Sequence, residues 1–341
     1  MKKAVLIIVL LLIAIGGFFG FKFYKKNFGN NIKKDGYVLI PHGADFKQIL
    51  DSAARYIDNS AAFESVATEK NLQKTFKPGR YHFKKGMGNS NLVNMIKAGN
   101  QSENSFRIGD FGDVYQMLGK VTRKTEIDSL KFVDEFNKIA VKKGYTSAED
   151  LKKYFFIDTY NFYWTVTPSE FFKKFDDQYQ EFWNTDRKAK EAQSGLSRDQ
   201  IYALASIVFK ESGGKPDEMK TIAGLYLNRY KKDMKLQSDP TVIYAMNKQN
   251  NFKESIKRVL YKHLSTPSPF NTYAQKGIPP GPICITDKNS VDAVLNSEKN
   301  SFIFMCADPS RPGFHKFTDN AEEHAANAKV YQEWLNSRNI K

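Results

Sequence analysis

The sequence is poor in the residues that build covalent or metal-based frameworks. Among 341 residues there are two cysteines, Cys284 and Cys306, three tryptophans and five histidines. Two cysteines exclude a disulfide-dense scaffold and a cysteine-rich zinc site. Hydrophobic residues make up 41% of the chain, which is enough for a packed core and excludes extended disorder. We expect about two domains, at roughly one per ~150 residues.

Acidic residues are in the minority. The chain has 37 Asp and Glu against 52 Lys and Arg, a net charge of +15. A basic surface suits nucleic acid, an anionic membrane or an acidic polymer. The lysines are scattered, without an arginine stripe, zinc-finger spacing or aromatic RNA-binding signature. We therefore expect no nucleic-acid partner, and favour lipid headgroups or an anionic wall polymer.

Only one long apolar run is present, at residues 4–21, which carry no charge. As a helix this run spans ~27 Å, close to the hydrocarbon thickness of a bilayer. The alternative is a cleaved signal peptide, but aromatic residues and lysines stand where small cleavage-site residues are expected. We predict a single-pass anchor over 4–24. Residues 1–3 would be cytoplasmic, because long domains translocate largely regardless of flanking charge.

The next residues predict a short linker and a small mixed module. Residues 25–35 are polar and rich in asparagine, as linkers are. Within 36–104 we predict a strand at 37–40, a helix from Asp45, a turn and strand at 77–83 and a helix at 91–96.

Residues 105–341 predict a larger, mainly helical part. Helical spacing marks 129–143 and 168–190, on either side of an aromatic block at 154–164. Such a block is core by default, with a sugar-stacking surface as the alternative. The predicted fold class is α+β: one N-terminal transmembrane helix, a small βα module and a mixed, mainly helical domain.

One helix presents a carboxylate in an unusual place. Ser197 and Gln200 form a capping-box pattern, and the helix should run to Ser212 before Gly213. Glu211 lies at i+7 from Leu204, on the apolar face. Desolvation there would raise its pKa, as a general acid requires. The alternative is a glutamate that reaches solvent from a frayed helix end.

Histidine-based metal binding is not expected. His315 and His324 are nine residues apart and belong to no metal-ligand motif, so we predict neither a metal nor a cofactor. A loop dense in glycine and proline at 277–283 would form either the stiff wall of a substrate groove or an ordinary surface crossover.

Several segments together carry a resemblance to a known family. SIVFKES, LQSDPTVIY, FNTY followed by GIPPGPI, and GFHKFTDN occur in that order, after a KPGRYHF turn and an N-terminal anchor. In these features the chain resembles the MltG (YceG-like) family of endolytic murein transglycosylases. The resemblance covers nearly the whole chain and is strongest over 196–325.

The resemblance implies a fold and an activity. Residues 36–104 would be a LysM-like module and 105–341 a catalytic domain on the periplasmic side of the inner membrane. Glu211 would be the general acid and base that cleaves the MurNAc–GlcNAc bond and leaves 1,6-anhydro-MurNAc ends. The substrate, peptidoglycan strands, would be bound by five residues: Gln237, Asp239, Asn271, Tyr273 and His315. Cell-wall synthases (penicillin-binding proteins) are implied as possible partners, and no cofactor is.

Two positions depart from the family pattern, and two other functions stay open. Phe209 stands where the family commonly has an acidic residue, and Ile157 where a proline usually precedes Asp158. The alternatives are a non-catalytic peptidoglycan-binding scaffold and a muramidase-type hydrolase.

Overall fold

The computed structural model describes residues 2–253, 256 and 259–338. The chain forms two compact units, each discontinuous in sequence. The first comprises residues 1–105, 121–128 and 161–167, and the second comprises 106–120, 129–160 and 168–341. Helices dominate the described residues, with three two-stranded sheets among them, so the predicted α+β class is confirmed.

The first unit begins with the apolar helix α1 (Lys2–Phe28). Its most apolar 18-residue window has a mean hydropathy of 2.9, and none of that window is buried in the protein. Such a helix is long and apolar enough to cross a bilayer, although a signal sequence can satisfy the same test. The helix ends at Phe28, so the segment predicted as a linker from residue 25 starts inside it.

The small module of the first unit is built on two antiparallel strands, β1 (Gly36–Ile40) and β2 (Gly79–Phe83), which pair although three helices lie between them in the sequence. Val38 lies opposite Tyr81 and both are buried, as the alternation of a half-buried strand requires. Four helices accompany the two strands: α2 (Phe46–Ala54), α3 (Ser60–Glu69), α4 (Leu72–Thr75) and α5 (Asn89–Ala98). The two predicted strands and two predicted helices are present, whereas α3 and α4 were not predicted. The likeness to LysM stays a prediction.

Two later segments complete this unit. The backbone N–H of Glu126 donates to the carbonyl of Trp164 at 2.8 Å. The Glu126 carboxylate accepts from the backbone N–H of His42 at 2.6 Å and lies 2.7 Å from its Nδ1. Residues 121–128 and 161–167 are therefore tied to the module across the sequence.

The core of the second unit begins with the aromatic block. Phe155 and Phe156 are 1% exposed, and the ring of Phe155 contacts Phe136 and Phe175. Most aromatic side chains of the block are therefore core, as predicted, whereas Tyr163 is exposed. The elements of this region are β3 (Asn104–Ile108) paired with β4 (Asp158–Phe162), α6 (Val114–Thr122), α7 (Ser129–Lys142), the 3-10 helix η1 (Ala148–Tyr154), α8 (Pro168–Phe182) and α9 (Thr185–Ser194). The single helix expected at 168–190 is two helices, because Asn184 caps α9 and interrupts the run.

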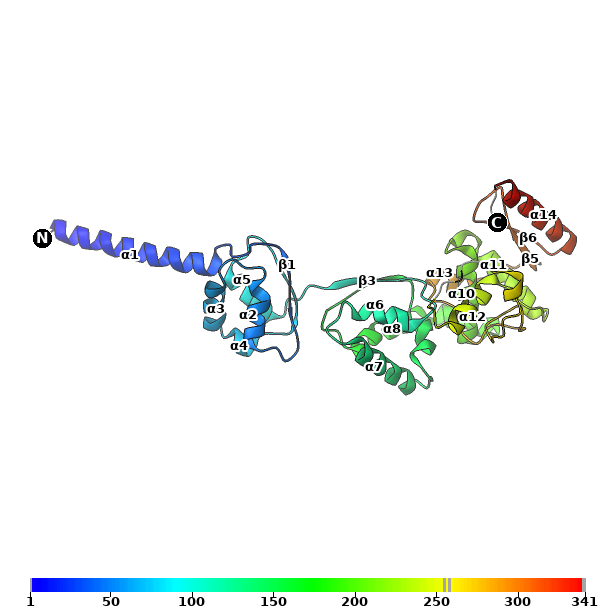
Figure 1. The fold of residues 1–341 in the computed structure, drawn as a ribbon, viewed down its shortest axis with the longest axis horizontal. Helices are drawn as coiled ribbons and strands as arrows, with labels where there is room; N and C mark the ends of the chain where they lie inside the picture. The colour runs from blue at the N-terminus through cyan, green and yellow to red at the C-terminus, as the bar shows by residue number, and fades with distance from the viewer. Residues whose placement is uncertain (1, 254–255, 257–258, 339–341) are drawn as a thin grey trace. The chain divides into compact units, whose positions relative to one another are not determined.

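The rest of the second unit surrounds one buried helix, α10 (Arg198–Ser212), which packs against α11 (Met219–Lys231) and α13 (Lys288–Leu295) (Figure 1). Strand β5 (Phe304–Ala307) pairs antiparallel with β6 (His315–Thr318), and α14 (Ala321–Ser337) lies against both. The remaining elements are the 3-10 helices η2 (Pro216–Glu218) and η3 (Tyr261–His263) and the helix α12 (Asp239–Gln249).

Candidate active site

The position of Glu211 follows from the way α10 is built. The predicted capping box between Ser197 and Gln200 is present. Leu204 and Val208 are fully buried, which fixes the rotation of the helix. The helix ends at Gly213, whose φ of 59° favours glycine, and Glu211 lies in the last turn. The side chain thus leaves the core stripe at the end of the helix, where it is partly exposed.

Two hydroxyl groups hold the Glu211 carboxylate. Tyr226 Oη donates to Oε1 at 2.7 Å, and Ser238 Oγ donates to the same oxygen at 2.6 Å. Burial of the carboxyl raises the pKa of Glu211, while the two hydroxyls and the nearby His315 oppose that rise. The net direction is upward, so Glu211 keeps its proton to a higher pH than an exposed glutamate. No described residue donates to Oε2, which leaves that oxygen for a ligand.

Ser238 is itself held for this contact. It is the N-cap residue of α12, but its hydroxyl makes no capping bond and instead donates to Glu211. Its backbone N–H donates to Thr272 Oγ1 at 2.9 Å. Thr272 and Thr241 share a hydrogen bond of 2.8 Å between their hydroxyls, and all three residues are buried. The loop at 271–273 therefore fixes the start of α12 beside the end of α10.

Glu211 lines a cavity of about 370 Å³ within the second unit. Four of the five predicted substrate-binding residues line the same cavity: Gln237, Asp239, Tyr273 and His315. Residues of α11 and β5 complete its wall, including Tyr226, Arg229, Phe304 and Cys306. The structure thus brings together residues that lie more than a hundred positions apart in sequence, such as Glu211 and His315.

Asp239 and Tyr273 form a pair on the rim. Tyr273 Oη donates to Asp239 Oδ1 at 2.7 Å. Burial raises the pKa of the Tyr273 hydroxyl, and the bond to Asp239 raises it further, so this group stays a neutral donor near pH 7. Asp239 is exposed at the first position of α12, where the helix dipole favours a negative charge.

Gln237 is held by a buried arginine. The backbone of Gln237 has a φ of 55°, a left-handed conformation that few residues other than glycine adopt. Arg229 Nη2 donates to Gln237 Oε1, while Nε and Nη1 donate to the carbonyls of Lys235 and Ile303 at 3.0 and 3.1 Å. The amide of Gln237 is thereby oriented, and no acceptor for its NH₂ group is seen among the residues that the structure describes.

His315 is oriented by Glu218. The backbone N–H of His315 donates to Glu218 Oε1 at 2.8 Å, and its Nδ1 lies 3.0 Å from Oε2. Both side chains are mostly buried. A carboxylate on Nδ1 favours a proton on that nitrogen, so Nε2 is the ring nitrogen left for the cavity.

Asn271 has a different place from the other predicted residues. Its side chain is fully buried and lies outside the cavity lining. Nδ2 donates to the carbonyls of Leu264 and Thr266 at 2.9 and 2.8 Å, and Oδ1 accepts from the backbone N–H of Tyr273 at 2.9 Å. These contacts occupy the amide, so Asn271 shapes the loop that carries Tyr273.

Sequence reasoning missed four residues that touch the predicted ones: Tyr226, Arg229, Ser238 and Glu218. Tyr226 and Arg229 are buried on α11, where a tyrosine and the stem of an arginine resemble core residues. Ser238 lies inside the LQSDPTVIY segment and could have been included on that ground. Nothing in the sequence pairs Glu218 with a histidine 97 positions later.

The described residues include no group of three or more Cys, His, Asp or Glu side chains placed to hold a metal. Cys306 lines the cavity, Cys284 is buried, and both thiols are free. Burial raises the pKa of Cys284 to about 12, which keeps it an unreactive thiol.

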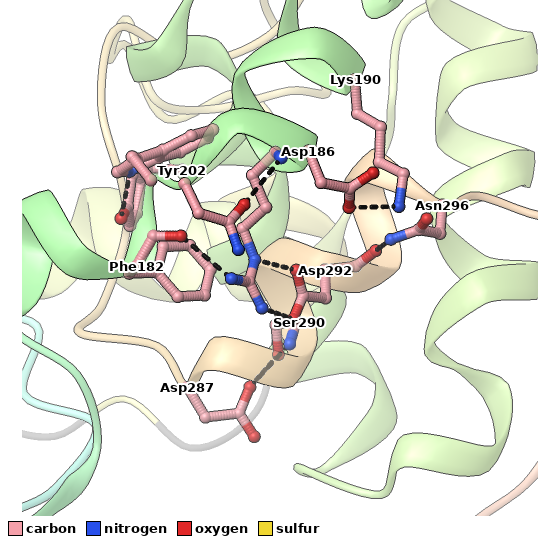
Figure 2. A network of polar contacts seen from close by, with 11 residues as sticks. Phe182, Asp186, Lys190, Tyr202, Asp287, Ser290, Asp292 and Asn296 are labelled. Carbon is pink, nitrogen blue, oxygen red and sulfur yellow. Dashed lines mark hydrogen bonds and ion pairs between the residues drawn. The ribbon is translucent and has the colours of Figure 1, made fainter.

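A second cavity of about 460 Å³ lies between α9 and α13 but carries a different kind of chemistry. In its polar wall Arg187 donates two hydrogen bonds to the Asp292 carboxylate, at 2.6 and 2.8 Å. Figure 2 shows Asp292 within this network of polar contacts. Lys190 pairs with Asp186 at 2.8 Å in the same network (Figure 2). These opposite charges neutralise each other, so the network joins two helices and leaves Glu211 in the first cavity as the stronger candidate.

Comparison with known proteins gives a consistent result. A family profile described as the YceG-like family matches residues 38–330. A protein of Bacillus subtilis (strain 168) named endolytic murein transglycosylase is 28% identical over 352 residues, covering 96% of this chain and 92% of the relative. A protein of the same name from Streptococcus pneumoniae serotype 2 (strain D39) is 25% identical, and the match covers 94% of this chain but only 63% of that relative.

A solved structure shares the fold. The 2.6 Å crystal structure of a YceG-like protein from Listeria monocytogenes superposes with a TM-score of 0.56 at 24% identity, covering 86% of this chain and 99% of that one. The family profile extends over most of the chain and includes every residue of the cavity described above. The resemblance seen in the sequence is confirmed, and this chain belongs to the YceG-like family.

Proposed function

We propose that this protein is a membrane-anchored endolytic transglycosylase that cleaves peptidoglycan glycan strands, with Glu211 as general acid and base. The curated relatives bear that enzyme's name, and the second unit has a cavity to match. The observation that carries the proposal is the Glu211 carboxyl. It lines a polar cavity, two hydroxyls hold one of its oxygens, and its pKa is raised.

The chemistry proceeds in two proton transfers. Protonated Glu211 donates to the glycosidic oxygen between MurNAc and GlcNAc, and the bond to the anomeric carbon breaks. The resulting carboxylate then takes the proton of the MurNAc 6-hydroxyl as that oxygen attacks the anomeric carbon, closing the 1,6-anhydro ring. No water is consumed. Tyr226 and Ser238 stabilise the carboxylate formed between the two steps, since hydrogen bonds to an ionised acceptor are the stronger kind.

The cavity wall offers partners for the sugar. Gln237, Asp239, Tyr273 and His315 present amide, carboxylate, hydroxyl and imidazole groups around Glu211, which suits hydroxyl and N-acetyl substituents. We propose that Asn271 acts indirectly, by holding the Tyr273 loop.

A muramidase-type hydrolase is the second candidate, and Asp239 is the observation that favours it. Hydrolytic glycosidases use two carboxyl groups. Asp239 lines the same cavity and lies near enough to Glu211 to raise its pKa. In a hydrolase it would activate water, and the product would carry a reducing end. In the transglycosylase it binds the substrate, in partnership with Tyr273.

Membrane anchoring is part of the proposal. Helix α1 would cross the cytoplasmic membrane once, with its N-terminus in the cytoplasm and the residues after α1 on the periplasmic side. There the basic surface would face anionic lipid and the peptide carboxylates of the wall. Nascent strands, made beside the membrane by cell-wall synthases, would be within reach.

The test is digestion of purified glycan strands by the full chain in detergent, with the products identified by mass spectrometry. We expect 1,6-anhydro ends from the wild type, and a loss of about 10²–10⁴-fold in rate for Glu211→Gln. Glu181→Gln, an exposed glutamate on α8, is the matched control and should cut normally.

Each other outcome identifies a competing function. Reducing ends from the wild type would establish hydrolysis, and Asp239→Asn should then abolish it. Binding of strands without cleavage by either protein would establish a scaffold. Full activity in Glu211→Gln would remove Glu211 from the mechanism.

A further inference from the structure

The first unit contains a basic pocket that the proposed reaction does not use. It has a volume of about 360 Å³ and lies where α1 meets the small module. Lys22, Lys25 and Lys26 line one side, and Asn59, Ala62 and Asn89 line the other. Asp58 is the one acidic residue in its wall, so the wall carries three positive charges and one negative.

The pocket is rigidly framed because the last turn of α1 is built into the module. Asn27 is 4% exposed, and its Oδ1 accepts from Ser90 Oγ at 2.9 Å. Asn89 Nδ2 donates to the carbonyl of Lys26 at 2.8 Å, and its Oδ1 accepts from Asn31 Nδ2 at 2.7 Å. These contacts fix the backbone at the end of α1, so the three lysines start from defined positions beside the module.

Two of the three lysines have known neighbours. Lys22 Nζ lies 4.5 Å from the ring of Phe18, one turn earlier on the helix, and Lys26 pairs with Glu69. No described residue is seen to pair with the ammonium group of Lys25. The pocket therefore holds more positive charge than its own residues neutralise.

The position of the pocket relative to the membrane indicates which kind of anion it would bind. The uncharged run of α1 ends at Phe21, and Lys22 follows it directly. If α1 spans the bilayer as proposed above, these lysines lie at the level of the lipid headgroups. From this geometry we propose that the pocket binds the phosphate of an anionic phospholipid headgroup. Asp58 and the asparagines add acceptors and donors for headgroup hydroxyls, which favours a glycerol headgroup such as that of phosphatidylglycerol.

The competing explanation is diffuse attraction of lysines to an anionic surface, which needs no pocket. Shape distinguishes the two. Ala62 lines the pocket on α3, and its neighbour Ala61 is exposed on the same helix and lies outside the lining. Ala62→Trp fills the pocket without changing any charge, and Ala61→Trp adds the same side chain outside it.

The experiment is native mass spectrometry of the full chain in detergent, titrated with phosphatidylglycerol or phosphatidylcholine. We expect the wild type to retain phosphatidylglycerol in preference. Ala62→Trp should bind it about tenfold more weakly, the effect of losing one charge-assisted hydrogen bond. Ala61→Trp should match the wild type. Competition with soluble glycerol 3-phosphate distinguishes a lipid ligand from a soluble phosphate ester. If micromolar glycerol 3-phosphate displaced all of the lipid, a soluble phosphate would be the ligand.

Several results would overturn the proposal. Equal retention of both lipids, or equal binding by Ala62→Trp and the wild type, would leave only diffuse attraction. The strand-cleavage assay is read separately, and Ala62→Trp should cut detergent-solubilised strands at the wild-type rate. Equal retention of the two lipids by a wild type that still cleaves strands therefore refutes this site alone, whereas failure of the wild type to cleave strands refutes the proposed function alone.

Discussion

Ser238 and Tyr226 set the chemistry of the candidate site at the level of single atoms. Both donate to the same oxygen of Glu211 and so counteract part of the pKa rise caused by burial. A general acid needs a raised pKa, and a general base in the next step needs a stable carboxylate. The two hydroxyls reconcile these demands, because they stabilise the charged form without supplying a positive charge.

Removing one hydroxyl gives a prediction with a definite sign. The Ser238 bond lowers the pKa of Glu211, so Ser238→Ala should raise it. In the proposed mechanism the protonated Glu211 is the reactive form, so activity should fall as pH rises through this pKa. The alkaline limb of the pH–rate profile of kcat/KM should therefore move to higher pH in Ser238→Ala.

The control for that experiment is Ser212→Ala. Ser212 is also buried near the end of α10, but its hydroxyl donates to the Phe209 carbonyl at 3.2 Å. The alkaline limb of the pH–rate profile of Ser212→Ala should lie at the same pH as in the wild type. An unmoved or downward-shifted limb in Ser238→Ala would contradict the assignment of Glu211 as the acid.

The sequence predicted some of these residues and not others for a physical reason. Glu211 could be found because helical periodicity and a terminal glycine show which face a residue occupies and where the helix ends. Tyr226 could not, because a tyrosine on an apolar face is usually core. Asn271 was expected in the groove, but its amide satisfies backbone groups of its own loop, and a motif does not distinguish these two uses.

At the level of elements, strands and helices with clear periodicity and caps were predictable, while their ends were less so. The segment KKNF was expected to start a linker because its composition is polar. It continues α1 because Asn27 finds a buried partner in Ser90 and Lys26 in Asn89. A polar residue whose partner lies some 60 positions away leaves no trace in a local pattern.

A substitution at Gly88, the N-cap residue of α5, tests how closely the end of α1 approaches α5. A Cβ added at this residue would lie 2.6 Å from backbone atoms of Phe28, although its φ of −91° suits any amino acid. Gly88→Ala should therefore destabilise the first unit by about 1–3 kcal/mol, the usual effect of overpacking. Thermal unfolding followed by circular dichroism measures the change.

Gly119→Ala is the contrasting variant. Gly119 lies within α6, and a Cβ there meets no described atom within 4 Å. Alanine in a helix interior should stabilise by about 0.5–1 kcal/mol. If Gly88→Ala were as stable as the wild type, the close approach of α1 to α5 would be incorrect.

At the level of the whole molecule, two units that each have their own core should unfold in separate transitions. The first unit includes residues 121–128, so its stability depends on a segment outside 1–105. Glu126→Ala removes the acceptor of the His42 backbone N–H. If the first unit loses about 1 kcal/mol of stability, its Tm should fall by about 4–8 °C, while the Tm of the second unit should not change.

Glu64→Ala provides the comparison for that shift. Glu64 is an exposed residue of α3, and its loss should leave both transitions near those of the wild type. Equal shifts in both variants, or a shift of both transitions in Glu126→Ala, would show that residues 121–128 do not belong to the first unit. The sequence predicts one boundary near residue 104. In the structure the chain returns to the first unit twice after that point, at residues 121–128 and 161–167.

The joint between α1 and α5 also limits where the chain can be shortened. A cut after Phe28 would remove the partners of Ser90 and Asn89, leaving buried polar groups unsatisfied. A cut that spares Lys26 and Asn27 has to fall at or before the lysines that follow the apolar run. If α1 spans the bilayer as proposed, a protease that released the first unit with this joint intact would have to cleave inside the membrane or at its surface. A fragment beginning at residue 30 would start with a damaged module.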